Sequence, residues 1–450
     1  MTDRPVEVER VGIEHVPDQM RHGSPGRTFT LWFAANLTIA DYVIGVLSTA
    51  SWGFTLSQAL PILVVGNLAG GILLGLAASM GPSLGFPQML SSRSSFGRLG
   101  NYLPAGLNWV STVGWFTINT ILAVFALQVI FPGASFAVAA AGYVLIQTLI
   151  AVYGHDFIHL FEKGMSVVLG LLFLFIFALT IPSLGKALSY VPSNAVGALS
   201  IGSIGLLLVA SFSYLMSWAP YASDYSRYLP ASTSKTRVAT FALAGGAVSS
   251  FAVEAVGAVV GSLTAAQTLA GSVFSGLYYF AGEFGSLAML TLILGAFAAD
   301  ALNLYTNSLS ALVLDVKAAR WKAVAAGGVV GFLIAITVGS AFEPFYENFL
   351  LALSYWITPW LGIVLVDFFV VRRTATQGVE GAPSFDWGAL GVYCVSILVS
   401  VPFMVPLISQ LDVFPVGSLS SWFGGADFSY FVSFVAACLM TLALRKSKGR

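Results

Sequence analysis

The stretch FTLWFAANLTIADYVIGVLSTASWGFTLS at residues 29–57 decides how the rest of the chain is interpreted. It is apolar enough to enter a bilayer, yet polar side chains lie near its middle: Asn36, Thr38 and Asp41. A carboxylate at membrane depth costs about 3 kcal/mol on insertion scales, so it rarely faces lipid. A helix that carries one usually lines a cavity, often where its backbone is interrupted and free carbonyls can bind a ligand. We therefore expect this first segment to form half of a binding site.

Composition places the chain among polytopic membrane proteins. Hydrophobic residues make up 57% of the 450 residues and charged residues 9%, too little charge to cover a soluble domain of this size. The formal net charge is zero and the basic residues do not cluster, so nucleic acid is not expected as a partner. Cys394 and Cys438 both fall in predicted membrane helices, where we interpret them as small buried hydrophobes rather than a disulfide or metal pair. Residues 1–28 are polar and charged, unlike a cleavable signal peptide.

Apolar runs long enough to cross a bilayer recur along the whole chain and predict an all-α fold with twelve membrane-spanning helices. We expect them at 29–50, 57–79, 101–131, 135–154, 162–184, 199–222, 237–262, 283–313, 321–341, 346–371, 388–409 and 426–444.

The basic residues predict the orientation. With these spans, 19 of the 20 Lys and Arg residues fall on one side of the membrane and only Lys186 falls on the other. The positive-inside rule then puts both termini in the cytoplasm of a protein of the cell membrane. The chain divides into a cytoplasmic N-terminal segment (1–28), a transporter core (29–371), a cytoplasmic loop (372–387), two further helices (388–444) and a cytoplasmic tail (445–450).

The sixth span indicates an internal repeat. Its sequence ASFSYLMSWAPYASDYSRY (210–228) resembles the first span in having polar and small residues, with Pro220, near the middle. Spans 1–5 and 6–10 then form two halves of opposite orientation, the plan of many secondary transporters. The alternative is that Pro220 simply ends the sixth span at the cytoplasmic edge.

Two membrane helices carry polar patterns that suit a planar ligand. Trp115 and Asn119 are four residues apart and share one helix face, so they offer a flat aromatic surface beside an amide. Alternatively, the tryptophan faces lipid and the asparagine joins two helices. In the eighth span, Asp300, Asn303 and Asn307 form a stripe that should face the protein interior.

Other features have structural explanations that we weigh against functional ones. Asp367 is expected to pair with Arg372 and Arg373, whereas Glu254 fits a buried protonated acid and a functional one equally well. The Gly-x-x-x-Gly spacings at 71/75 and 257/261 indicate close helix packing. His155 and His159 are assigned to a cytoplasmic loop, where solvation is favoured over metal binding.

No enzyme is expected. The sequence shows no phosphate-binding Gly-rich loop with its lysine, no nucleophile elbow and no H-E-x-x-H motif. An ion channel would not need the tryptophan–asparagine pair, and a non-transporting receptor remains an alternative. The sequence carries no signal of oligomeric state.

Several motifs resemble the nucleobase:cation symporter-1 family, and within it the purine–cytosine permease branch. They are GIEHVP at 12–17, GNL at 66–68, PQM at 87–89, SRSSFGRLGNYLP at 92–104, VGWFTIN at 113–119 and SWAPYASDYSRY at 217–228. The resemblance implies a LeuT-like fold, a five-plus-five inverted repeat followed by two added helices. It also implies proton- or sodium-driven uptake of a nucleobase or related heterocycle.

The resemblance also implies site residues. Trp115 matches the family's stacking tryptophan and Asn119 its amide one turn later, while Asn303 matches the asparagine of the eighth helix. The remaining implied contacts are Tyr214 and Trp218, as alternatives on the sixth helix, and Thr38, Asp41 and Tyr42 on the first.

One departure from the family pattern bears on the coupling ion. Sodium-coupled members have hydroxyl side chains on the eighth helix where this chain has Phe297-Ala298-Ala299-Asp300, and methyl groups cannot ligate a hard cation. Asp41 and Asp300 lie on the two helices expected to face each other there, and a buried carboxylate can exchange a proton near neutral pH. We therefore expect proton coupling through Asp41 or Asp300, with no other cofactor. The alternative is a sodium-coupled permease for allantoin, a hydantoin or a vitamin B6-like heterocycle.

Overall fold

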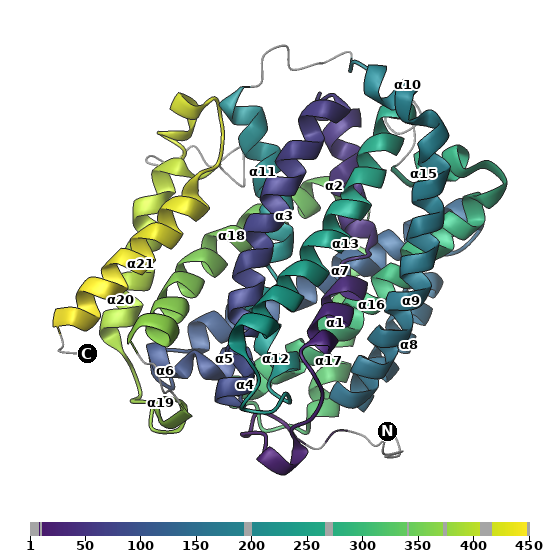
Figure 1. Ribbon diagram of the computed structural model, residues 1–450. Helices are drawn as coiled ribbons and strands as arrows, with labels where there is room; N and C mark the ends of the chain where they lie inside the picture. The colour runs from purple at the N-terminus through teal and green to yellow at the C-terminus, as the bar shows by residue number, and fades with distance from the viewer. Residues whose placement is uncertain are drawn as a thin grey trace.

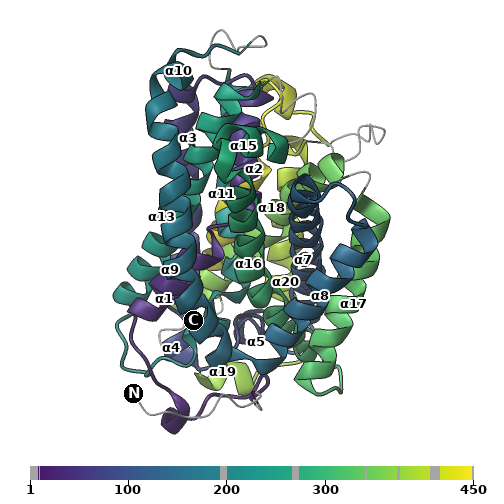
Figure 2. The ribbon, with the colours of Figure 1, turned by 90° about the vertical axis from the view of Figure 1, so that its right-hand side faces the viewer.

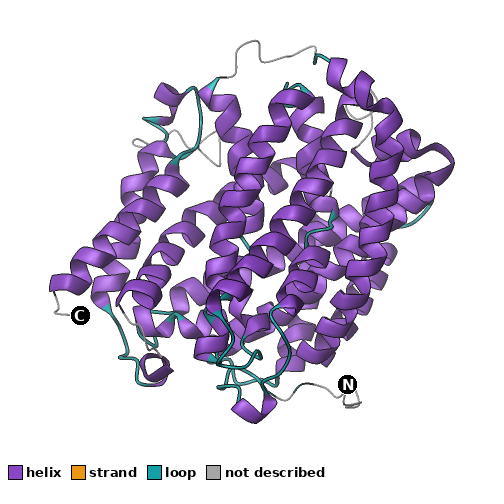
Figure 3. Cartoon of the chain, in the orientation of Figure 1, coloured by secondary structure: helices purple, strands orange, loops and turns teal. Residues whose placement is uncertain are grey.

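The computed structural model describes residues 9, 11–192, 200–265, 273–339, 342–371, 376–405 and 416–447, and every regular element among them is a helix (Figure 3). Within these residues, ten helices are long and apolar enough to cross a membrane. Gly26–Ala35 and Ile39–Ala50 form a bent pair that gives an eleventh candidate, and the shorter apolar stretch Trp387–Phe403 gives one more. The all-α prediction is confirmed, while the count of twelve spans stays a prediction.

The helices that build the molecule follow in chain order. They are α1 (Gly26–Ala35), α2 (Ile39–Ala50), α3 (Leu56–Ala78), α4 (Gly81–Leu84), α5 (Gln88–Ser91), α6 (Arg93–Phe96), α7 (Tyr102–Ile130), α8 (Phe136–Tyr153), α9 (His155–Thr180), α10 (Leu184–Ser189), α11 (Ile201–Met216), α12 (Ala222–Ser226), α13 (Lys235–Leu263), α15 (Val273–Ala281), α16 (Gly285–Val313), α17 (Arg320–Val338), α18 (Phe342–Val366), α19 (Thr376–Glu380), α20 (Trp387–Ser400) and α21 (Ser429–Ser447).

Two groups of helices pack around the middle of the molecule (Figures 1 and 2). In the first group, α2 and α3 pack against α13, and α11 packs against α3. In the second group, α7, α8, α16 and α17 pack against one another. Helix α1 contacts α13 and α9, and α9 contacts α16, so both lie between the groups. Helices α18, α20 and α21 pack together at the side.

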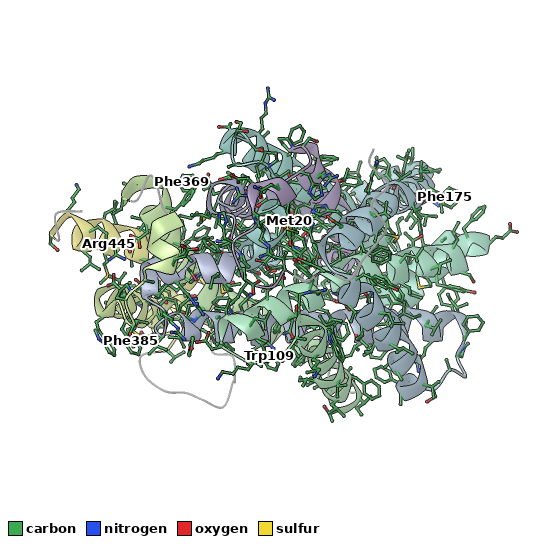
Figure 4. All side chains as sticks on the ribbon, turned by 90° about the horizontal axis from the view of Figure 1, so that it is seen from below. Met20, Trp109, Phe175, Phe369, Phe385 and Arg445 are labelled. Atoms are coloured by element: carbon green, nitrogen blue, oxygen red, sulfur yellow. The ribbon has the colours of Figure 1, made fainter. Side chains whose placement is uncertain are left out.

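The beginning of α1 and the end of α21 lie at the same end of the bundle, beside α4–α6 (Figure 1). We call this the N/C end. Helix α10, which carries Lys186, lies at the opposite end. Seen from the N/C end, Arg445 of α21 lies toward one edge of the molecule and Phe175 of α9 toward the other (Figure 4).

The two predicted Gly-x-x-x-Gly packing sites are confirmed. A Cβ atom added to Gly71 or Gly75 of α3, or to Gly257 or Gly261 of α13, would lie 2.3–2.6 Å from an atom of a neighbouring helix. Real side chains do not approach so closely, so these helices pack at this distance because the positions lack a Cβ.

Asp367 forms a structural ion pair, as expected, but its partner comes from α21. Arg445 holds both carboxylate oxygens at 2.8 Å and donates a further 2.6 Å hydrogen bond to Asp386. Arg372 and Arg373, the partners expected from the sequence, lie outside the described residues. Sequence proximity suggested them, whereas the packing of α21 against α18 brings Arg445 to the carboxylate.

Two local predictions were wrong. His155 and His159 lie in the first turns of α9, because this helix begins at His155 rather than at residue 162, and His155 is buried. Cys394 is exposed on the outer surface of α20 rather than buried, and both cysteines are free. The alternative in which Pro220 ends the sixth span is excluded, since helical structure continues through α12.

Candidate functional site

The first predicted span is interrupted where its polar residues lie. Helices α1 and α2 meet at an angle of 58°, with Asn36 and Thr38 in the break. The Asn36 amide nitrogen donates to the Trp32 carbonyl at 2.7 Å, and Thr38 caps α2 by accepting from the backbone N–H of Asp41 at 3.4 Å. These side chains form hydrogen bonds with backbone groups at the interruption, where the helical pattern of backbone hydrogen bonds is broken. This explains why polar residues occupy this place in an apolar segment.

This break is bonded to the interrupted part of the sixth span. There α11 ends at Met216, a 3₁₀ turn covers Ala219–Tyr221, and α12 follows. Trp218 Nε1 donates to Asn36 Oδ1 at 2.8 Å, and the hydroxyls of Thr38 and Tyr214 hydrogen-bond at 2.7 Å. Hydrogen bonds therefore join the interrupted part of the first span to the sixth span.

Trp115 of α7 lies in an aromatic cluster between the two groups of helices. Its ring makes edge contacts with Tyr214 (centroids 5.3 Å apart) and with Phe349 of α18 (5.2 Å). Its buried Nε1 has no hydrogen-bond partner within the described ranges. Trp218 instead contacts Trp32 at 5.4 Å. Of the two alternatives on the sixth span, Tyr214 is thus the residue that lies against Trp115.

The asparagines predicted to bind a ligand are joined by Asp300. Its Oδ1 accepts from Asn119 Nδ2 at 2.9 Å and from Asn303 Nδ2 at 3.1 Å. Its Oδ2 accepts from the Tyr143 hydroxyl of α8 at 3.1 Å. The Tyr221 hydroxyl donates to Asn303 Oδ1 at 3.2 Å, while Asn119 Oδ1 has no hydrogen-bond partner among the described residues. The carboxylate therefore fixes the orientation of both amides and leaves the Asn119 oxygen free.

Asp41 and Asp300 lie on helices that contact each other, as expected, but the two carboxyl groups hydrogen-bond to different helices. Asp41 Oδ2 accepts from Ser250 of α13 at 3.0 Å, and Asp41 interacts electrostatically with Glu254 of the same helix. Asp41 follows the break by a turn of α2, which directs its side chain toward α13, whereas Asp300 faces α7 and α8. The α16 backbone does approach the break, because a Cβ on Gly295 would lie 2.1 Å from the Leu37 carbonyl oxygen.

The predicted ligand-binding residues are closed off from solvent. All six are at most 4% exposed: Tyr42, Trp115, Asn119, Tyr214, Trp218 and Asn303. The polar stripe of α16 is also buried, and Asn307 donates to the Trp109 carbonyl and the Thr112 hydroxyl of α7, both at 3.0 Å. Tyr42 has no hydrogen bond or ring contact with the others in the described part of the chain, so the structure does not join it to the site.

Sequence reasoning missed Tyr143, Tyr221 and Phe349. A signal existed for the first: Tyr143 and Gln147 are one turn apart in an apolar helix, and Gln147 donates to the Tyr143 hydroxyl at 3.4 Å. Tyr221 and Phe349 are aromatic residues in aromatic-rich spans, and only the tertiary packing distinguishes them.

A family model described as "Permease for cytosine/purines, uracil, thiamine, allantoin" matches residues 15–432. The chain belongs to this family. It is a multi-pass integral membrane protein of the nucleobase:cation symporter-1 group, in its purine–cytosine branch.

Relatives and a solved structure agree with this assignment. A Bacillus subtilis (strain 168) protein, provisionally named a purine-cytosine permease, is 29% identical over 98% of this chain and 97% of its own length. A purine-cytosine permease of Saccharomyces cerevisiae is 25% identical over 94% of this chain and 83% of its own length. The solved structure of Mhp1, a nucleobase-cation-symport-1 family transporter, was captured in a closed conformation with bromovinylhydantoin bound. It aligns with a TM-score of 0.77 at 18% identity, covering 99% of this chain and 96% of Mhp1. The LeuT-like fold expected from the sequence is confirmed.

Proposed function

We propose that this permease imports a nucleobase, cytosine or a purine, across the plasma membrane by proton symport, as a transporter and not as an enzyme. The observation that carries the proposal is that Asp300 holds Asn119 and Asn303, while Trp115 lies one helical turn before Asn119 on the same helix, all of them buried. An aromatic face beside two oriented amides suits a planar heterocycle with mixed donors and acceptors. The names of the purine-cytosine permease relatives support the same substrate class.

In this mechanism the base stacks on Trp115 while the Asn119 and Asn303 amides hydrogen-bond its edge. Asp300 takes one N–H of each amide, so the Asn119 oxygen is left to accept from the base and the second N–H of each amide is left to donate to it. Protonation of an intramembrane acid, Asp41 or Asp300, favours occlusion from the outside, and both proton and base leave to the cytoplasm. Because binding linkage is reciprocal, a proton that tightens base binding is itself held more tightly when the base is present.

The proposal includes the orientation and the division of the chain given above. Both termini lie in the cytoplasm, residues 29–371 form the transport core, and residues 388–444 add two helices. The shared end of α1 and α21, and Lys186 at the opposite end, support this orientation.

The test is uptake of radiolabelled cytosine and purines into proteoliposomes under an imposed pH gradient without sodium. We expect accumulation by the wild type and its loss in Trp115→Ala. Trp422→Ala is the matched control, since Trp422 is 81% exposed whereas the site residues are buried, and it should transport normally. Uptake that required sodium would overturn proton coupling. If no base moved under either gradient, the substrate class would be wrong, and hydantoins, allantoin and vitamin B6 compounds would be the next candidates.

A further inference from the structure

We propose that the carboxyl groups of Asp41 and Glu254 form one site that takes up the coupling proton. This inference rests on the proton symport proposed above and deepens it, because it replaces the open choice between Asp41 and Asp300 with a specific pair of acids.

Helices α2 and α13 run side by side in a fixed register that brings the two acids together. Ser250 Oγ donates to Asp41 Oδ2 at 3.0 Å and Thr49 Oγ1 donates to the Ala258 carbonyl at 2.9 Å, each across a sequence separation of 209 residues. Gly45 faces Glu254 at the same separation, and a Cβ there would lie 2.0 Å from the Glu254 carbonyl oxygen.

This register also sets the direction in which the Glu254 side chain points. Helical side chains lean toward the N-terminus of their own helix. The Glu254 side chain therefore extends over the turn of Ser250, which is the residue that binds Asp41.

Each acid has one oxygen with hydrogen-bond donors and one oxygen without. Glu254 Oε2 accepts from Ser211 at 3.2 Å and, in a shorter bond, from Asn67. Among the residues that the structure describes, Glu254 Oε1 and Asp41 Oδ1 have no hydrogen-bond partner, and both residues are 0% exposed. The donors to both acids in the described structure are neutral, and holding two charged carboxylates in such a place costs several kcal/mol each. A proton on a bare oxygen removes one charge without displacing any donor.

In the described part of the chain, the other titratable groups that interact with the pair are phenols. Tyr214 of α11 interacts electrostatically with Asp41, and Tyr346 of α18 interacts with both acids. Phenols ordinarily ionise near pH 10, so they stay neutral at physiological pH. Of these groups, the two carboxyls are those that can exchange a proton there.

Asp300 differs from the pair in a way that argues against its carrying the proton. Both of its oxygens accept hydrogen bonds, two on Oδ1 and one on Oδ2. A carboxylate can accept at both oxygens, whereas a protonated carboxyl must turn one of them into a donor. Protonation at Oδ1 would disturb the bonds that orient Asn119 and Asn303, and protonation at Oδ2 would force the Tyr143 hydroxyl to rotate and accept. A proton on the acid pair displaces no donor, so we assign Asp300 a positioning role.

A short chain of contacts links the acid pair to the proposed base site. The Asp41 backbone N–H donates to Thr38 Oγ1, which hydrogen-bonds Tyr214, whose ring contacts Trp115. A change of charge at Asp41 can therefore alter the surroundings of the stacking tryptophan through packed, bonded neighbours.

The experiment compares exchange with accumulation in proteoliposomes containing the full chain. For one proton per base, an inward gradient of one pH unit supports about tenfold accumulation. We expect Glu254→Gln to exchange internal for external cytosine while its accumulation ratio falls to about one, because Gln mimics the protonated acid but cannot release a proton. Glu162→Gln is the matched control, since Glu162 is also a fully buried acid, on α9, and it should accumulate cytosine as the wild type does.

Wild-type accumulation by Glu254→Gln would overturn the inference, whereas a wild type that neither exchanged nor accumulated cytosine would overturn the proposed function itself. A second measurement covers a variant that fails to fold. Cytosine binding to the detergent-solubilised wild type and to Asp300→Asn should take up a proton from a weakly buffered solution containing a pH indicator. Loss of that uptake in Asp300→Asn, with cytosine still bound, would place the proton on Asp300 and refute the pair.

Discussion

Replacing Asp300 should weaken base binding through the two amides that it orients. In Asp300→Ala three buried donors lose their acceptor, from Asn119, Asn303 and Tyr143. Asn303 keeps its bond from Tyr221, but Asn119 loses the hydrogen bond that holds its amide. Each buried donor left unpaired costs about 1–3 kcal/mol. Since two of the three belong to the amides proposed to contact the base, we expect the cytosine Kd to rise roughly 10- to 100-fold.

Asp300→Asn should be milder. The new amide oxygen can still accept from Asn119 and Asn303, and the Tyr143 hydroxyl can rotate to accept from the new NH₂ group. The variant loses only the extra strength that a charged acceptor gives to these hydrogen bonds. This loss is on the order of 1 kcal/mol, which corresponds to about a fivefold rise in the cytosine Kd.

Radioligand binding of cytosine to the purified full chain measures both variants, and thermal unfolding checks that each one folds. Asn307→Ala is the control on the same helix, because Asn307 bonds to α7 rather than to Asp300 and should change stability but not the Kd. Wild-type affinity in Asp300→Ala would refute the positioning role. Equal losses in both variants would show that the charge of Asp300, and not its geometry, is what the site needs.

Three further predictions concern stability, each measured by thermal unfolding in detergent. Gly45→Ala forces a Cβ against the Glu254 carbonyl and should cost about 1–3 kcal/mol, whereas Gly106→Ala, where a Cβ meets nothing within 4 Å, should be neutral or stabilising. Arg445→Met leaves two carboxylates without their arginine and should cost roughly 3–5 kcal/mol; an unchanged midpoint would contradict this. The pKa of His22 is raised, chiefly by its hydrogen bond to Asp156 of α9. Protonated His22 should therefore stabilise the folded protein below pH 6.5, and this contribution should be lost as the pH rises through the raised pKa. His22 is 41% exposed, so His22→Gln should lower stability by well under about 1 kcal/mol at pH 5.5 and leave it unchanged at pH 8.5.

The sequence predicts the elements of this site better than their connections. Polar residues in apolar segments, such as Asn36 and Asp300, can be recognised one by one because burying them is costly unless something binds them. Trp115 and Asn119 follow from helical spacing. The direction in which the Asp41 side chain points could not be predicted from helical spacing, because it depends on which face α2 turns toward α13. That rotation is set by Gly45 and Gly257, where one helix touches the backbone of the other.

Arg445 shows the same limit. Its partner Asp367 is 78 residues away in the sequence, and the local pattern pointed to the adjacent arginines instead. Long-range pairing of this kind depends on the packing of α18 against α21, which hydrophobic periodicity alone does not specify.

The two bonded networks belong to different groups of helices, and this division suits alternating access. Asp300 and the residues that donate to it lie on α7, α8 and α16, all within the second group. Asp41, Glu254 and their donors lie on α2, α3, α11 and α13, all within the first group. When one group rocks against the other, neither carboxyl network has to break; the side-chain contacts that must change include the Trp115–Tyr214 ring contact and the Tyr221–Asn303 hydrogen bond. The base would thus be held by one group of helices and the proton by the other. Binding of one ligand then affects binding of the other only through the contacts between the two groups, at the closed aromatic site.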